Sequence, residues 1–151
     1  MDVKYGITDA FTLDMTLIPD FGQTRFDNQI LNLSQFEVEF NENRQFFTEG
    51  LELFNKAGIF YSRRVGGRPL YARSINNELE VDEKLTEIPA QSKLLNATKV
   101  SGRNKKGLGI GVFNAVENRV YATIEDTNRN VQRTVEINPL TNYNVLVFDQ
   151  V

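Results

Sequence analysis

Five glutamates lie close together in the first third of the chain, and carboxylates are residues that can carry out acid–base chemistry. They are Glu37, Glu39, Glu42, Glu49 and Glu52. Two carboxylates at a suitable separation hydrolyse glycosides, one as the acid and the other as a base or nucleophile. One hypothesis is therefore a carboxylate-dependent hydrolase of glycosides centred on Glu42 and Glu49.

The same carboxylates have a structural alternative, because arginines lie near them in the sequence. Arginine offers carboxylates a planar pair of donors, and buried charges need partners. We predict that Glu42 and Glu49 form an ion-pair network with Arg44, Arg63 and Arg64. We favour this network because the stretch has no histidine, no metal-binding motif and no recognisable acid–base spacing.

Aromatic residues accompany these charges. Phe46, Phe47 and Tyr61 could form a platform on which sugar rings stack, together with Phe54 and Phe60. Packing in a core is the alternative, since aromatic side chains bury large areas when a short segment docks.

The glycines at 107, 109 and 111 resemble the start of a phosphate-binding loop. Asn114, however, stands at the third glycine position, and the segment has the pattern of a strand. Small residues on one face of a strand instead leave room for a neighbouring segment.

Composition narrows the chemistry further. The chain has 151 residues, a formal net charge of −3, and neither histidine nor cysteine. These absences exclude thiol nucleophiles, disulfides, zinc–thiolate sites and histidine bases. The run Asp126–Asn130 begins like a calcium loop, but Val131 replaces the required glycine. We expect one domain with no metal, no cofactor and no nucleic-acid partner.

Alternation between apolar and polar residues is the strongest structural signal. From Ala10 to Leu17, every second residue is apolar, as expected for a β-strand with one apolar face. The alternation predicts hairpins with turns near Thr8–Ala10, Arg103–Gly107 and Asp126–Asn130. The predicted apolar face comprises Leu13, Met15, Leu17, Leu108, Ile110 and Val112.

Alternation is poor in the middle of the chain. There the sequence predicts a short helix within Arg44–Lys56, with Thr48 as its N-cap and Gly58 as its stop. Within 60–73 an extended segment that ends at a turn at Gly66 and Gly67 is expected to follow, and then a polar surface loop over 74–93.

No apolar run approaches the roughly 20 residues of a membrane helix, and the first residues do not resemble a signal peptide. A strand that crosses a bilayer needs only about 9–11 residues, which helix-based hydropathy does not detect. After Pro139 the sequence NYNVLVFDQV starts a strand at the chain end. We therefore expect the chain to be a fragment.

Four motifs in order carry a family resemblance: KYGITDAFTLDMTLIPDFGQ, NLSQFEVEFNENRQFFTEG, FYSRRVGG and SGRNKKGLGIGVFNAV. They resemble the early part of an uncharacterised outer-membrane β-barrel family of Gram-negative bacteria. Members typically carry a preceding domain like carbohydrate-binding module family nine, which this sequence does not include. The family commonly has Pro where Gln45 stands and Ile where Val65 stands. The resemblance implies an outer-membrane location and a mostly unassigned function, and it supplies no catalytic residues.

Together these observations predict an all-β protein of antiparallel strands and hairpins, part of an outer-membrane β-barrel. Residues 1–18 form a hairpin, 19–93 an inserted plug-like or rim segment with a short helix, and 94–151 further barrel strands. The expected partners are outer-membrane lipid, which contacts the apolar face, and a saccharide or other small solute. The alternatives are the glycoside hydrolase and a soluble periplasmic β-sandwich that acts as an interaction module.

Overall fold

A computed structural model describes residues 1–19, 41–58 and 60–151. These residues contain eight β-strands and four short 3-10 helices, and every strand pairing is antiparallel. The predicted all-β antiparallel fold is confirmed. No helix in the described ranges has the length and hydrophobicity needed to cross a membrane.

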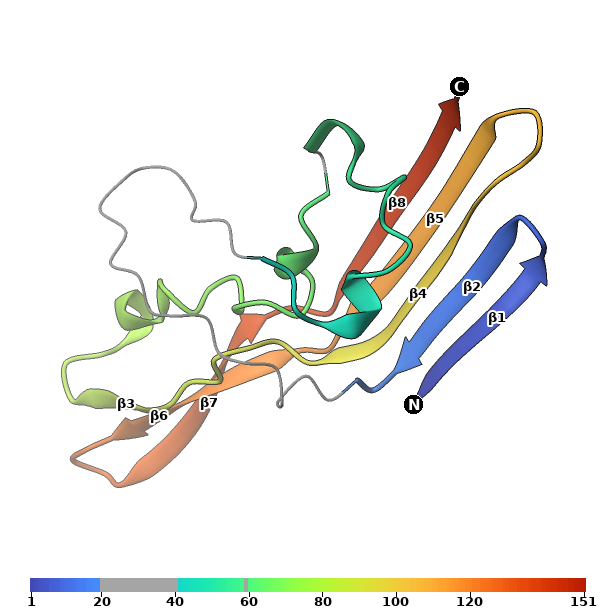
Figure 1. Cartoon of the computed structure of the whole chain (residues 1–151). Helices are drawn as coiled ribbons and strands as arrows, with labels where there is room; N and C mark the ends of the chain where they lie inside the picture. The colour runs from blue at the N-terminus through green and yellow to red at the C-terminus, as the bar shows by residue number, and fades with distance from the viewer. Residues whose placement is uncertain (20–40, 59) are drawn as a thin grey trace.

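Five strands form the larger sheet, which we call sheet A. Their order is β1-β2-β4-β5-β8, so β1 and β8 are its two edges within the described residues (Figure 1). The bounds are β1 Asp2–Thr8, β2 Phe11–Leu17, β4 Leu94–Arg103, β5 Leu108–Glu117 and β8 Thr141–Gln150.

Three strands form the smaller sheet B, in the order β3-β6-β7. They are β3 Glu83–Glu87, β6 Val120–Asp126 and β7 Val131–Asn138. Sheet B continues the hairpin of β5 and β8: Glu117 pairs with Thr141 in sheet A, and Val120 pairs with Asn138 just beyond. It therefore extends from one end of sheet A, as Figure 1 shows.

The three predicted hairpin turns are all present. Thr8 pairs with Phe11 across the first turn, and Gly107 closes the second turn with a φ of 84°. In the third turn Asn130 adopts a φ of 55° and its N–H donates to the carbonyl of Asp126. Asparagine and glycine tolerate this left-handed conformation better than other residues do.

Strand alternation gives sheet A two different faces. Residues opposite each other on paired strands share a face. One row across the sheet contains Tyr5, Leu13, Val100, Val112 and Leu146, and it is apolar throughout. We call the face that carries this row the outer face.

The opposite, inner face is covered by a segment that crosses it. This covering segment comprises residues 41–58 and 60–67 and lies over sheet A in Figure 1. Phe47 and Phe54 from the segment pack in one buried cluster with Phe113 and Ala115 of β5. Burial of these large apolar side chains is the main force that holds the segment on the sheet.

Two glycines of β5 permit this close packing. A Cβ on Gly109 would lie 2.9 Å from Leu53 Cδ2, and one on Gly111 would lie 3.0 Å from Phe54 Cζ. The inner-face glycines thus make room for the covering segment.

The prediction of a short α-helix within Arg44–Lys56 is wrong. The segment instead has 3-10 helices at Gln45–Phe47 and Lys56–Gly58, with turns between them. Thr48 is a C-cap whose N–H donates to the carbonyl of Gln45. Gly50 has a φ of 63°, a left-handed conformation that interrupts an α-helix at this point.

The expectations for 60–93 also need correction. A 3-10 helix at Ser62–Arg64 interrupts the stretch expected to be extended, and another lies at Ile75–Glu78. The expected polar loop contains β3, because Leu85 packs against the buried cluster of sheet B. The flanking charged residues concealed this short edge strand in the sequence.

Candidate functional site

Arg44 and Glu42 form the most enclosed ion pair among the predicted site residues. Arg44 Nε donates to Glu42 Oε1 at 2.8 Å, and Nη2 donates to Oε2 at 2.7 Å. The Arg44 side chain is only 5% exposed. Its guanidinium also donates to the carbonyls of Ser62 and Val65, so one side chain ties the two ends of the covering segment together.

Glu42 is held as a carboxylate. Burial raises its pKa, but hydrogen bonds from Arg44 and from the Ser62 hydroxyl outweigh burial and lower the pKa below its ordinary value. The Ser62 Oγ donates to Glu42 Oε2 at 2.7 Å. Glu42 therefore neutralises a buried cation.

The two later arginines have a smaller part in this pair. Arg63 Nη1 lies 3.9 Å from Glu42 Oε1, which is the outer limit of an ion pair. The Arg64 guanidinium carbon lies 5.8 Å from the centre of the Tyr61 ring. The structure thus brings Glu42, Arg44 and Arg63 together, with Arg44 as the main partner.

Glu49 pairs with a residue outside the predicted network. Lys4 Nζ of β1 lies 2.6 Å from Glu49 Oε2, and both side chains are more than half exposed. The hydrogen bond from Lys4 lowers the pKa of Glu49. This exposed pair links the covering segment to the edge of sheet A.

Lys99 on the inner face of β4 was not singled out from the sequence. Its side chain is 1% exposed, and its Nζ donates to the backbone carbonyls of Phe46 and Glu49. The same nitrogen lies 3.7 Å from Asp14 Oδ2 and 4.6 Å from the centre of the Phe46 ring. Its inner-face position between Ala97 and Ser101 was the available signal, because a lysine there must find partners.

Glu117 is a second buried charge that sequence reasoning missed. It is 2% exposed, at the junction of the two sheets. Its carboxylate accepts hydrogen bonds from the Gly66 N–H at 2.6 Å and from Asn138 Nδ2 at 3.1 Å. Asn138 Oδ1 in turn accepts from the Leu70 N–H at 3.1 Å. These bonds join the end of the covering segment to β5 and β7.

The three candidate stacking residues differ in exposure. Phe47 is 1% exposed and packs edge-on against Phe46, with ring centres 5.0 Å apart. The Arg44 guanidinium carbon lies 4.2 Å from the Phe47 ring centre. Phe47 therefore belongs to the core, whereas Phe46 and Tyr61 are half-buried.

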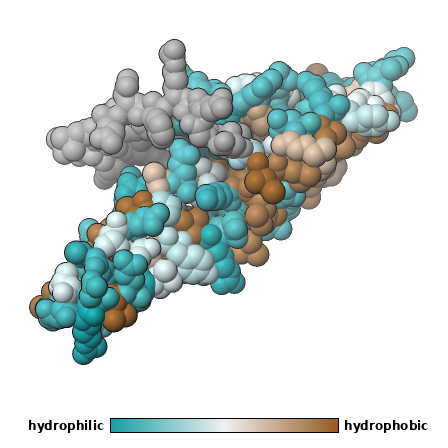
Figure 2. Space-filling model, turned by 90° about the horizontal axis from the view of Figure 1, so that it is seen from below, coloured by the Kyte–Doolittle hydropathy of each residue, from teal (hydrophilic) through white to brown (hydrophobic). Residues whose placement is uncertain are grey.

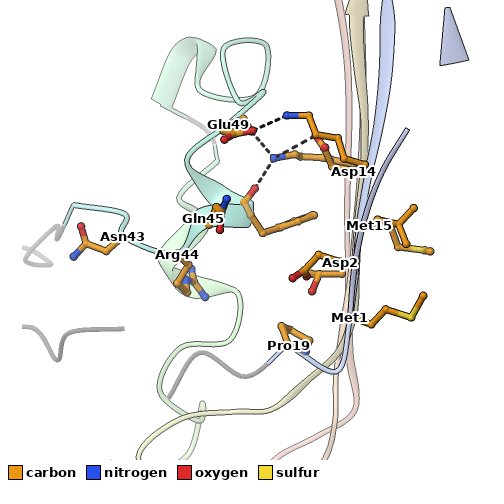
Figure 3. A pocket seen from close by; sticks show the side chains of 14 residues that line it. Met1, Asp2, Asp14, Met15, Pro19, Asn43, Arg44, Gln45 and Glu49 are labelled. Atoms are coloured by element: carbon orange, nitrogen blue, oxygen red, sulfur yellow. Dashed lines mark hydrogen bonds and ion pairs between the residues drawn. The ribbon is translucent and has the colours of Figure 1, made fainter. Parts of the chain in front are cut away.

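A hollow of about 520 Å³ opens between the covering segment and the first two strands. In Figure 3, Asn43, Gln45 and Glu49 lie on the segment side, and Asp2 and Asp14 lie on the strand side. Hydrogen bonds from Lys4 to Glu49 and from Lys99 to the Phe46 carbonyl join the two sides. The hollow is lined by polar and apolar groups in about equal measure, and its polar groups could hydrogen-bond a small polar solute.

Glu42 and Glu49 differ from the general acid of a glycosidase in the direction of their pKa shifts. The general acid of that reaction needs a raised pKa, whereas Glu42 and Glu49 both have lowered pKa values and cationic partners. Glu37 and Glu39 lie outside the described residues. In the part of the chain that the structure describes, no three His, Cys, Asp or Glu residues are grouped to hold a metal.

The geometry defines a class of protein: an antiparallel sheet with an apolar row on its outer face and an inner face closed by a packed segment. The chain belongs to the family described as a domain of unknown function (DUF5916), whose match extends over residues 1–151. No functionally curated protein and no solved structure matches the chain significantly. Membership in a family of unassigned function, as the resemblance implied, is confirmed.

Proposed function

We propose that sheet A is part of the wall of an outer-membrane β-barrel, with its outer face on lipid and the covering segment as an internal plug. The observation that supports this most is the exposure of large apolar side chains on the outer face. Leu146 is 67% exposed and Phe148 is 73% exposed. Figure 2 shows hydrophobic residues gathered over one part of the molecule, with hydrophilic residues toward its ends.

The alternation of the strands supports the same assignment. Strands of membrane barrels place apolar residues toward lipid and polar residues toward the lumen. On β8 the neighbours of the exposed Phe148 are the inner-face residues Val147 and Asp149, and Asp149 pairs with Lys56 of the covering segment at 2.6 Å. The inner face thus carries the charges that anchor the segment.

The open edges of sheet A fit a wall that other strands complete. β1 and β8 each pair on one side only within the described residues. Unpaired backbone groups in hydrocarbon cost several kcal/mol each, by order of magnitude, so a membrane sheet must pair both edges. In the proposed barrel, further strands pair with β1 and β8.

The proposed role is non-enzymatic: a surface or channel component that handles saccharides or other small solutes. The hollow beside Asp2, Asp14 and Glu49 supports this role, because it carries charged side chains and lies at the margin of the plug. The hydrolase alternative lacks a carboxylate of raised pKa at Glu42 or Glu49. A sandwich would place a second sheet over the outer face, whereas sheet B extends from the end of sheet A.

Site-specific labelling tests the proposal. The sequence has no cysteine, so a single introduced thiol carries the only label. We would attach a polarity-sensitive fluorophore to Leu146→Cys and, as the matched control, to its inner-face neighbour Val145→Cys. The protein would be reconstituted in phosphatidylethanolamine–phosphatidylglycerol vesicles. We expect nitroxide lipids to quench the label at 146 and to leave the label at 145 unquenched.

The same assay can contradict the proposed membrane location. Equal, weak quenching at both positions, together with a stable monomer in the absence of detergent, would contradict the membrane proposal and support the sandwich.

A further inference from the structure

We propose that the membrane surface crosses sheet A obliquely, so that a polar patch on its outer face lies among lipid headgroups and sheet B projects into water. This inference rests on the proposed function. The patch, which we call the asparagine patch, comprises Asn96, Thr98, Asn114, Asn142 and Asn144.

The strand register places the asparagine patch on the face that also carries the apolar row. A second register row lies two residues closer to sheet B. In this row Met15 pairs with Thr98, Thr98 with Asn114, and Asn114 with Asn144. The outer face therefore changes from apolar to polar within a single row, between β2 and β4.

The asparagines of the patch interact with one another. Asn114 Nδ2 lies 2.6 Å from Asn142 Oδ1 and 2.9 Å from Asn144 Oδ1. Each amide group has two donor hydrogens and an acceptor oxygen, so these contacts satisfy only part of its hydrogen-bonding capacity. Transfer of an unsatisfied amide to hydrocarbon costs several kcal/mol, by order of magnitude, whereas headgroups and interfacial water offer partners. The patch fits the interface.

The border of the patch is stepped: on β4, β5 and β8 it follows Val100, Val112 and Leu146, which share one register row. On β8 the apolar residues nearest sheet B end at Leu146, whose row includes Leu13 of β2. On β2 they continue to Leu17, which pairs with Asn96 of the patch. Between β2 and β8, the border thus moves along the strands by the interval from Leu13 to Leu17.

Strand tilt accounts for this displacement. Strands of a membrane barrel lie about 4.8 Å apart and tilt by about 40° from the membrane normal. Each step to the next strand therefore changes the depth of a register row in the membrane by roughly 3 Å. Three steps separate β2 from β8, which gives roughly 9 Å of depth, or about four residues along a tilted strand. The interval from Leu13 to Leu17 has this length. The total displacement between β2 and β8 therefore matches the tilt of barrel strands, and all of it falls at the step from β2 to β4.

The side of the patch away from the apolar row leads to sheet B, whose surface carries charged pairs. Arg133 pairs with Glu83 at 2.6 Å, and Arg119 pairs with Glu136 at 3.1 Å. Ion pairs at a sheet surface are compatible with water and not with hydrocarbon. This arrangement places sheet B beyond the headgroups.

Depth measurements along one register row test the inference. We would label Met15→Cys, Thr98→Cys and Asn144→Cys separately, with Leu146→Cys as the reference on β8. Nitroxides would be placed either in the headgroup or deep in the acyl chain of phosphatidylethanolamine–phosphatidylglycerol vesicles. We expect the ratio of deep to shallow quenching to be above one at Met15 and Leu146, below one at Asn144, and intermediate at Thr98.

The outcomes separate this inference from the proposed function. Equal ratios at Met15 and Asn144, with both labels quenched, would overturn the oblique boundary and leave the lipid-facing sheet intact. Absence of quenching at Met15 and Leu146 would overturn the proposed function, and the boundary with it. Three positions of one register row are measured on three strands. If one of these variants fails to fold, the other two still report the change of depth along the row.

Discussion

At the scale of single residues, the pair of Glu42 and Arg44 is the first to test. Removal of one partner of a buried, hydrogen-bonded pair typically costs about 3–5 kcal/mol, because the other charge stays buried. We expect Arg44→Met to lower the free energy of unfolding by about that amount, and the double variant with Glu42→Gln to recover part of it. Denaturant titration of the four proteins measures this coupling.

The exposed pair of Arg119 and Glu136 is the control for this cycle. Surface pairs contribute little to stability, so Arg119→Met should have a small effect. Equal losses at the two arginines, or simple additivity of Arg44→Met and Glu42→Gln, would contradict the structural role of Arg44.

Glu83 gives a prediction about pH. The hydrogen bond from Arg133, aided by the Glu80 N–H, lowers the pKa of Glu83 from 4.5 to about 2. A lowered folded-state pKa contributes stability that is complete above 4.5 and is lost as the pH falls toward 2. Unfolding midpoints measured between these pH values should therefore fall less steeply for Glu83→Gln than for the natural chain. Parallel profiles would show that this pair does not affect folding.

At the scale of elements, Gly111 controls how closely the covering segment approaches β5. A Cβ there would lie 3.0 Å from Phe54 Cζ, so Gly111→Val should lower stability by about 1–3 kcal/mol through overpacking. Gly6→Val in β1 is the matched control, because a Cβ at Gly6 has no neighbour within 4 Å. Thermal unfolding of both variants measures the difference. A loss at Gly6 equal to that at Gly111 would indicate a general effect of glycine replacement in strands.

These elements also show how far the sequence could predict the fold. Period-two alternation located the three hairpins, because the strands on both sides of each turn alternate between apolar and polar residues. The same local signal failed over Arg44–Lys56, where tertiary packing of Phe47 and Phe54 on the sheet determines the path. A helix and a series of turns give these apolar residues a similar spacing along the chain, so the spacing alone did not distinguish the two.

The candidate site was predictable only in part for a related reason. Glu42 and Arg44 are two residues apart, so their pairing could be predicted locally. Lys99 lies 53 residues from its partner Phe46, and Glu117 lies 51 residues from Gly66. Contacts of this length depend on which strands become neighbours, and the sequence pattern did not specify that order. The buried charges that hold the segment were therefore missed.

At the scale of the whole molecule, exposure has different meanings on the two sheets. Leu146 on sheet A is 67% exposed and Val131 at the tip of sheet B is 58% exposed. If both faced water, arginine at either position would have a similarly small effect. If sheet A faces lipid, Leu146→Arg should cost up to about 2–4 kcal/mol, depending on its depth, whereas Val131→Arg should cost little.

Denaturant titration of folding into vesicles measures the two costs. The comparison is informative because both side chains are already accessible, so neither substitution creates a cavity or a clash with the described core. Gly67 is unsuitable for such a comparison, because a Cβ there would lie 2.7 Å from the Arg63 carbonyl oxygen. A substitution at Gly67 would therefore disturb the covering segment by itself. A marked loss at Leu146 with none at Val131 is the result expected of a lipid-facing sheet A. Equal effects at the two positions would place the outer face of sheet A in the same solvent as sheet B.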